Sequence, residues 1–146
     1  MEAATSPVAA LDAALSRVGD RWSLLIVEAL LDGARRFNQL AGQVTGIAPN
    51  ILAERLRRLE REGVVVSQPY SRRPLRLEYR LSEDGLELAG VLRLLAAWGD
   101  RGPGPSDSGQ TGLQHEPCGT ALEARWYCPT CERSVVDAES SDLSYA

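Results

Sequence analysis

The spacing of apolar residues along the chain changes at Gly63. Before this glycine, Leu52, Leu56 and Leu59 recur at intervals of four and three residues, which places them on one face of an α-helix. After it, apolar and polar residues alternate over residues 75–81, as they do in a β-strand with one buried face. The pattern therefore predicts an amphipathic helix followed directly by a β-hairpin.

Local signals place the ends of this helix at Ala48 and Gly63. Pro49 suits the first helical position, because its missing N–H would have no partner inside the helix there. Gly63 can adopt the left-handed conformation that ends many helices. The hairpin tip, Ser71–Pro74, is polar and basic. A helix followed by a basic hairpin is typical of a winged helix, so we predict a mainly α fold with a small β-hairpin wing, of the α+β class.

Apolar periodicity predicts four more helices, over residues 8–18, 22–31, 38–44 and 83–99. The second is apolar on most sides and is the expected central core helix. The third is joined to the helix at Ala48 by a tight turn that contains a glycine, which is a helix-turn-helix arrangement. The first and last are more apolar than a small monomer needs, so we predict that they form a homodimer interface. The alternative is that the last is a single, well-covered core helix.

The composition limits the classes of protein that the chain can represent. With 146 residues, of which 44% are hydrophobic, it is long enough for one domain and a small appendage. Its apolar runs are too short to span a bilayer, and its start does not resemble a signal peptide, so we expect a cytoplasmic protein with no membrane partner. It has no phosphate-binding glycine loop and no nucleophile elbow, so we do not expect an enzyme.

The net charge of −4 conceals an uneven distribution. Residues 35–80 contain ten arginines and four acidic residues, a net charge of +6, whereas the rest of the chain carries −10. Because phosphate contacts depend on the local field of one face, the basic region favours binding to double-stranded DNA. An α-helix fits the major groove, which is about 12 Å wide, and arginines on a hairpin can enter the minor groove or contact phosphates.

Several side chains in the basic region are suited to DNA contacts. Asn50 can form two hydrogen bonds with adenine, Ala53 can contact a thymine methyl group, and Arg57 can reach guanine or phosphate. The full set of candidate DNA-contacting residues is Arg36, Pro49, Asn50, Ala53, Glu54, Arg57, Arg72, Arg73 and Arg76. Alternatively, the hairpin tip is basic only for solubility, and the helix presents only a solvated face in which Arg55, Arg57, Arg58 and Arg61 pair with Glu54, Glu60 and Glu62.

The residues after 101 carry a second signal. The only histidine and all three cysteines follow in the pattern H-x2-C-x9-C-x2-C, as His115, Cys118, Cys128 and Cys131. Three thiolates and one imidazole suit a closed tetrahedral Zn²⁺ site, so we predict one structural zinc ion per chain. The alternatives are a redox-active pair at Cys128 and Cys131, or thiols without a ligand.

These predictions divide the chain into four parts. They are a winged helix-turn-helix and dimerisation domain over residues 1–101, a linker over 102–112, a zinc-binding ribbon over 113–137 and a disordered tail over 138–146. Because the ribbon has few apolar residues, zinc would supply most of its folding free energy, on the order of 10 kcal/mol.

Several blocks of the sequence resemble the HxlR-type winged-helix transcriptional regulators, which are relatives of the MarR-like group. The blocks are GDRWSLLIVEALLDG, RRFNQL, GIAPNILAERLRRLEREGVV, PLRLEYRLSEDG and the WG at Trp98, and their order and spacing agree over Leu11–Arg101. The resemblance implies a dimeric DNA-binding repressor or activator, with the helix from Ala48 in the major groove and the Arg72–Arg76 loop as the wing. It does not cover residues 102–146.

The chain departs from the family pattern at two places. Many members sense oxidants or electrophiles through a cysteine just before the first helix, and this chain has none there. Members also often have serine where Ala48 stands, so a capping hydroxyl is lost.

We therefore predict a sequence-specific repressor that binds an inverted-repeat operator as a homodimer. The alternative is a zinc-ribbon interaction module whose winged helix binds another protein. The sequence identifies no operator, and it neither names nor excludes a small-molecule effector.

Overall fold

The computed structural model describes residues 6–101, 103 and 110–135. The predicted tail at 138–146 and most of the predicted linker lie outside these residues. The chain forms two compact units, one over Val8–Leu92 and the other containing Arg93 and the residues after it. The boundary between them falls inside the last helix, and the four predicted domain ranges stay predictions. No helix in the described ranges is long and apolar enough to cross a membrane.

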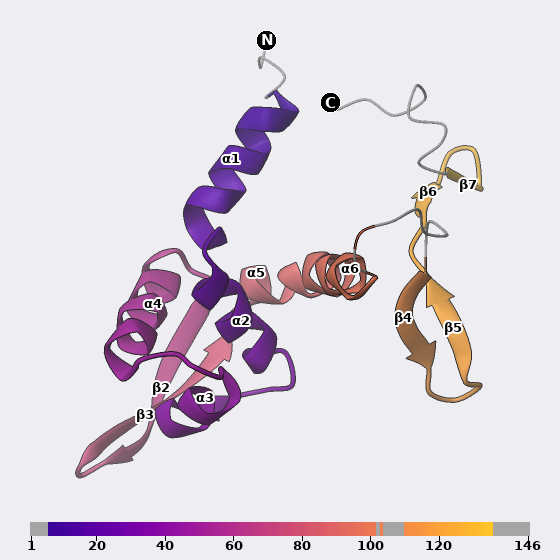
Figure 1. Cartoon of the computed structure of the whole chain (residues 1–146). Coiled ribbons are helices and arrows are strands. Elements are labelled where there is room, and N and C mark those ends of the chain that lie inside the picture. The colour runs from indigo at the N-terminus through magenta and orange to yellow at the C-terminus, as the bar shows by residue number, and fades with distance from the viewer. Residues whose placement is uncertain (1–5, 102, 104–109, 136–146) are drawn as a thin grey trace. The chain divides into compact units, whose positions relative to one another are not determined.

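In the unit over Val8–Leu92, helices α2 to α5 pack against a small antiparallel sheet with the strand order β1-β3-β2 (Figure 1). The helices are α1 Pro7–Val18, α2 Arg21–Leu30, α3 Phe37–Gln43, α4 Pro49–Arg61, α5 Glu83–Leu86 and α6 Leu88–Asp100. The strands are β1 Arg35–Arg36, β2 Val65–Arg72 and β3 Leu75–Leu81. Beyond α6, two separate hairpins pair β4 Gln110–His115 with β5 Thr120–Glu123, and β6 Trp126–Cys128 with β7 Arg133–Val135.

One apolar core holds α2, α3, α4 and the base of the hairpin together. The leucines predicted to form the inner face of α4, Leu52, Leu56 and Leu59, are all fully buried. They pack with buried residues of α2, α3, β2 and β3, among them Ile26, Val27, Leu30, Leu40, Val65 and Leu81. Gly63 has φ +73°, so it ends α4 in the predicted left-handed conformation.

The structure corrects two predictions about secondary structure. The predicted helix over residues 83–99 is interrupted at Glu87 and forms α5 and α6. The Ser82 hydroxyl accepts a hydrogen bond from Gly85 N–H and so caps α5, and it donates to Gly63 O at 2.5 Å. These bonds fix α5 to the end of α4, while α6 continues separately. Strand β1 was not predicted, because two arginines have no apolar alternation and form a strand only by pairing with β3.

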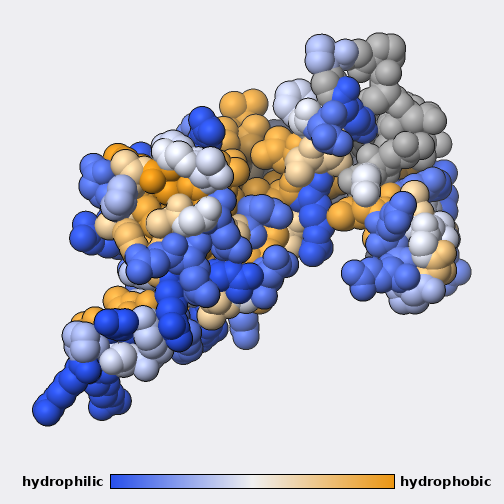
Figure 2. All heavy atoms as spheres, turned by 60° about the horizontal axis from the view of Figure 1, so that its bottom comes forward, coloured by the Kyte–Doolittle hydropathy of each residue, from blue (hydrophilic) through white to orange (hydrophobic). Residues whose placement is uncertain are grey.

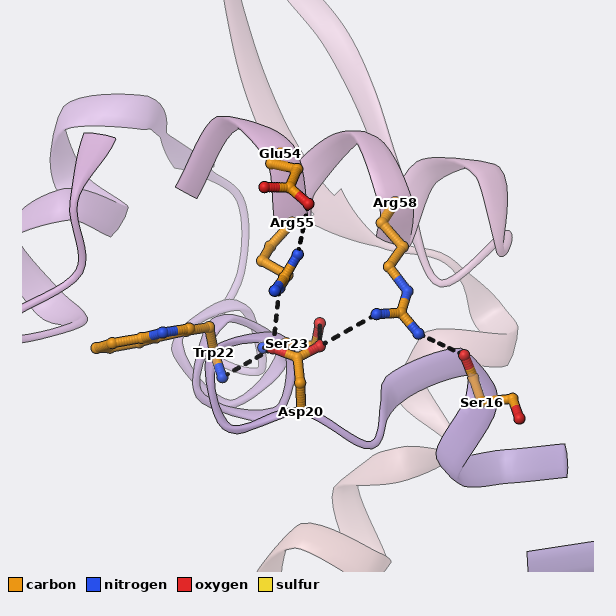
Figure 3. Close-up of polar contacts among 7 residues, drawn as sticks. All are labelled: Ser16, Asp20, Trp22, Ser23, Glu54, Arg55 and Arg58. Carbon is orange, nitrogen blue, oxygen red and sulfur yellow. Dashed lines mark hydrogen bonds and ion pairs between the residues drawn. The ribbon is translucent and has the colours of Figure 1, made fainter. Parts of the chain in front are cut away.

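The Asp20 carboxylate joins three helices (Figure 3). Its Oδ1 accepts hydrogen bonds from the Trp22 and Ser23 N–H groups, both at 3.1 Å, and so caps the N-terminus of α2. The same oxygen accepts from Arg55 Nε of α4 at 3.0 Å, and Oδ2 lies 3.6 Å from Arg58 Nη1. Arg58 in turn donates to Ser16 O in the last turn of α1 at 2.5 Å. We call Asp20, Arg55 and Arg58 the Asp20 clasp.

The Asp20 carboxylate within the clasp is only partly exposed, and this burial affects its pKa. Partial burial acts to raise the Asp20 pKa, but hydrogen bonds from the Ser23 side chain and N–H and from Arg55 outweigh it. The folded-state pKa of Asp20 therefore lies below that of an ordinary aspartic acid. The charged form is the one that the fold stabilises.

We predict that Asp20→Asn lowers the free energy of unfolding by about 1–2 kcal/mol, because asparagine keeps a capping oxygen but loses the charge that faces Arg55 and Arg58. Asp20→Ala also loses the cap and should cost about 1 kcal/mol more. Urea unfolding of the two variants at neutral pH tests this order. Equal stability of Asp20→Asn and the unsubstituted protein would show that the ion pairs contribute nothing.

The same substitution has a pH dependence with a defined sign. Folding lowers the Asp20 pKa, so the carboxylate makes its full contribution to the free energy of unfolding above its unfolded pKa of about 4. This contribution is lost as the pH falls through the lower pKa of the folded state. The stability difference between the unsubstituted protein and Asp20→Asn should therefore shrink below about pH 4, where urea unfolding can follow it.

Candidate nucleic-acid interface

The outer face of α4 carries the residues that were predicted to read bases. Pro49 occupies the first turn, and Asn50, Glu54 and Arg57 are exposed, whereas Ala53 is half-buried. Among the described residues, no side chain caps the first N–H groups of α4, since Ala48 at the N-cap has no acceptor. Free N–H groups at a helix N-terminus are suited to phosphate oxygens. The start of α4 can therefore contact both bases and backbone.

The four outer arginines of α4 divide into two pairs. Arg55 and Arg58 turn toward Asp20, and Arg55 also pairs with the adjacent Glu54. Arg57 and Arg61 are exposed and form no ion pair within the described ranges. Of the pairs with Glu54, Glu60 and Glu62 that the alternative predicted, the described residues show only Arg55–Glu54. Two of these arginines position the helix, and two are available to an external partner.

Strands β2 and β3 form the predicted wing, which projects beyond the helices (Figure 1). They pair from Val65 opposite Leu81 at the buried base to Arg72 opposite Leu75 at the tip, which turns at a cis Arg73–Pro74 bond. Leu75 at the tip is 68% exposed, whereas Leu81 at the base is 5% exposed. The projecting tip is hydrophilic, as its blue colour at the lower left of Figure 2 shows. The predicted contact residues Arg72, Arg73 and Arg76 are all exposed there.

Arg36 is held against the wing by an aromatic residue that the sequence analysis did not select. The Arg36 guanidinium lies 4.1 Å from the centroid of the Tyr70 ring, a cation–π contact. Tyr70 sits where the register of β2 and β3 shifts between Pro69 and Ser71, and Arg36 pairs with Glu78 in β1–β3. The signal that could have revealed this contact is an aromatic residue within an otherwise polar hairpin tip.

A shallow hollow of about 260 Å³ lies beside α1. It is lined by Ala14, Arg17, Val18, Val64, Asp84, Glu87, Leu88 and Val91. Arg17 Nη2 donates to Asp84 Oδ2 at 2.5 Å and to Glu62 O at 2.9 Å, so its charge is already paired. The hollow is below the usual size range of ligand sites, so it does not identify an effector.

The four predicted zinc ligands lie at the tips of the C-terminal hairpins, in two pairs. His115 Nδ1 is 3.2 Å from Cys118 Sγ, and Cys131 hydrogen-bonds to the Cys128 sulfur. The described residues contain no group of three or more His, Cys, Asp or Glu side chains that could hold a metal ion, so the two pairs are not joined. The thiol pKa of Cys118 is lowered by Thr120, and that of Cys128 by hydrogen bonds from Cys131 and Thr130.

Comparison with known proteins agrees with the arrangement of these elements. The model of a family described as HxlR-like helix-turn-helix matches residues 17–106. The uncharacterized HTH-type transcriptional regulator Rv3095 of Mycobacterium tuberculosis is 38% identical over 122 residues, which cover 84% of this chain and 77% of Rv3095. The HTH-type transcriptional regulator YodB of Bacillus subtilis is 35% identical over 98 residues, which cover 67% of this chain and 88% of YodB.

Solved structures show the same fold. The reduced form of YodB aligns with a TM-score of 0.57 at 34% identity, covering 70% of this chain and 98% of YodB. A regulator of the MarR family from Enterococcus faecalis aligns with a TM-score of 0.60 at 30% identity, covering 68% of this chain and 91% of that one. These proteins are named as regulators and not as enzymes, which confirms that prediction. The chain therefore belongs to the HxlR-like helix-turn-helix family of transcriptional regulators, as its α4 helix and basic wing had indicated.

Proposed function

We propose that the protein is a sequence-specific transcriptional repressor that binds an inverted-repeat operator as a homodimer. The observation that carries the proposal is the division of α4 into a buried leucine face and an exposed polar face, with an arginine-rich wing beyond it. A regulator of this kind acts on the chromosome, so the proposal places the protein in the cytoplasm of a bacterium.

In the proposed complex α4 lies in the major groove. Asn50 hydrogen-bonds to an adenine edge, Ala53 contacts a thymine methyl group, and Arg57 reaches guanine or phosphate, while Glu54 can accept from cytosine. On the wing, Arg72, Arg73 and Arg76 contact phosphates or enter the adjacent minor groove. Arg36, stacked on Tyr70, would approach the same backbone beside the wing. The Asp20 clasp limits the directions in which α4 can tilt.

Two exposed apolar stripes support the proposal of a homodimer. On α6, Val91, Leu94, Leu95 and Trp98 follow the spacing of one helical face and are 45–68% exposed. On α1, Val8, Leu11 and Leu15 follow the same rule and are 51–77% exposed. Burying both stripes against a second copy would remove them from water and produce a two-fold symmetric molecule. Such a dimer binds half-sites about one DNA turn apart, roughly 34 Å.

A winged helix that binds another protein is the competing function. Salt dependence separates the two functions, because the logarithm of the affinity of a protein that contacts Z phosphates falls with a slope of about −0.9Z against log salt.

In the proposal, repression results from occupancy of the operator, since a bound dimer that overlaps a promoter excludes RNA polymerase.

Base reading and phosphate contact should respond differently to mutation. We predict that Asn50→Ala weakens the best site by about 1–3 kcal/mol and relaxes base preference at one position in each half-site. Arg72→Ala should weaken all sequences alike and reduce the salt slope by about 1 per wing. Selection of bound sequences from a random DNA pool, followed by titrations at several salt concentrations, measures both.

Arg125→Ala is the matched control, because it removes the same charge from the C-terminal hairpins, where Arg125 pairs with Glu123. It should leave base preference and salt slope unchanged. If Asn50→Ala and Arg72→Ala bound every sequence as the unsubstituted protein does, α4 and the wing would not be the interface.

The dimer can be tested separately through α6. Leu95→Glu places a charge in the exposed stripe of both copies, and the lost burial of two leucines alone is worth about 3 kcal/mol, or roughly a 100-fold weaker dimer. Arg93→Glu is the control, since Arg93 lies on the other side of α6 from the stripe. Sedimentation over a range of concentrations should show dissociation of Leu95→Glu only. A monomeric unsubstituted protein at micromolar concentration would refute the homodimer.

A further inference from the structure

The ligand pairs at the two C-terminal hairpin tips do not form one group in the described residues. We infer that one structural Zn²⁺ brings the two tips together, so that the ion is held by His115, Cys118, Cys128 and Cys131 of the same chain. The site lies outside the residues proposed to contact DNA, so this inference stands or falls independently of the proposed function. Four arguments from the hairpins support it.

The ligand residues occupy equivalent positions in the two hairpins. His115 is the last residue of β4, and Cys118 follows three residues later, before β5 begins. Cys128 is the last residue of β6, and Cys131 again follows three residues later, before β7 begins. Each tip therefore presents a pair of metal-ligating side chains from the same two places in the same supersecondary structure. Neither hairpin needs these residue types to form its strands.

The backbone of the two tips is also alike. The residue after the second ligand has a positive φ in both, +68° at Gly119 and +52° at Glu132. Glu132 is the only residue other than glycine with a positive φ in the described part of the chain. A glutamate disfavours this conformation, whereas glycine adopts it freely. The turn at Glu132 is thus kept against local preference, as is common at functional sites.

The ligand atoms are already close within each pair. His115 Nδ1 and Cys118 Sγ are 3.2 Å apart, and Zn–N and Zn–S bonds of about 2.1 and 2.3 Å in a tetrahedron separate such atoms by roughly 3.5 Å. At the second tip, Cys128 and Cys131 are three residues apart on the turn between β6 and β7, the same spacing as His115 and Cys118.

The two hairpins have no buried apolar core among the described residues. From Gly112 to Val135 all residues except Cys128 and Val135 are exposed, and Trp126 and Tyr127 are about 60% exposed. No disulfide links any of the three cysteines. One pair of ligands is too few for a structural zinc ion, which takes four, so a single ion would have to join the tips. Metal coordination then cross-links the two hairpins, which have no apolar core large enough to hold them together.

Metal analysis of the full chain, purified without added zinc, tests the stoichiometry. We expect about one zinc ion per chain, and replacement by Co²⁺ should give the visible absorption of a tetrahedral thiolate site. Titration of the unsubstituted protein with a thiol-specific mercurial should release the zinc as the three cysteines are modified. This measurement needs no variant and does not depend on how well a variant folds.

Ligand variants test whether the two tips share the ion. His115→Ala, Cys118→Ser, Cys128→Ser and Cys131→Ser should each lose zinc to a chelator at least tenfold faster, whereas the control Thr130→Ser should retain it. Urea unfolding of the same variants shows whether the winged helix has remained folded. Retention of zinc by His115→Ala and Cys118→Ser would overturn the joined site. So would half an ion per chain, or a zinc-free protein with a Cys128–Cys131 disulfide.

Discussion

A single carboxylate, that of Asp20, links α2 to α4, the helix that is proposed to contact DNA. The Asp20 carboxylate caps the N-terminus of α2, the central core helix, and it also forms ion pairs with Arg55 and Arg58 of α4. A buried Ser23 hydroxyl also depends on it for its hydrogen bond. The buried leucines turn one face of α4 inward, and the directional charged contacts of Arg55 and Arg58 with Asp20 favour the same rotation. Asn50 and Arg57 therefore face outward.

The last turn of α1 is attached to the same region. Arg58 donates to Ser16 O, and Arg17 donates to Glu62 O at the end of α4 and to Asp84 of α5. Besides the apolar packing of Val18, charged hydrogen bonds therefore couple any movement of α1 to the end of α4. In the proposed dimer, the distance between the two recognition helices would be set partly by these contacts.

Local sequence signals predicted the elements well, because each depends on a few adjacent residues. The 4–3 spacing of Leu52, Leu56 and Leu59, the proline at the start of α4 and the glycine after it all lie within one segment. The features that were missed join distant residues. Arg55 and Asp20 are 35 positions apart, and β1 forms only because it pairs with β3. Arg36 contacts Tyr70, which lies in β2 where the register with β3 shifts. No periodicity within a segment carries such information.

The attachment of α1 has a consequence for the thermodynamics of the free chain. Only Val18 of this helix is buried, so its first turns have almost no contact that would stabilise them. A helix of 12 residues is marginal in water by its own propensity. In an isolated chain the N-terminal turns of α1 should therefore fray, and their helicity would depend on whatever covers Val8 and Leu11. If a second copy does so, helix formation becomes part of the association equilibrium, and far-ultraviolet circular dichroism would then change with protein concentration.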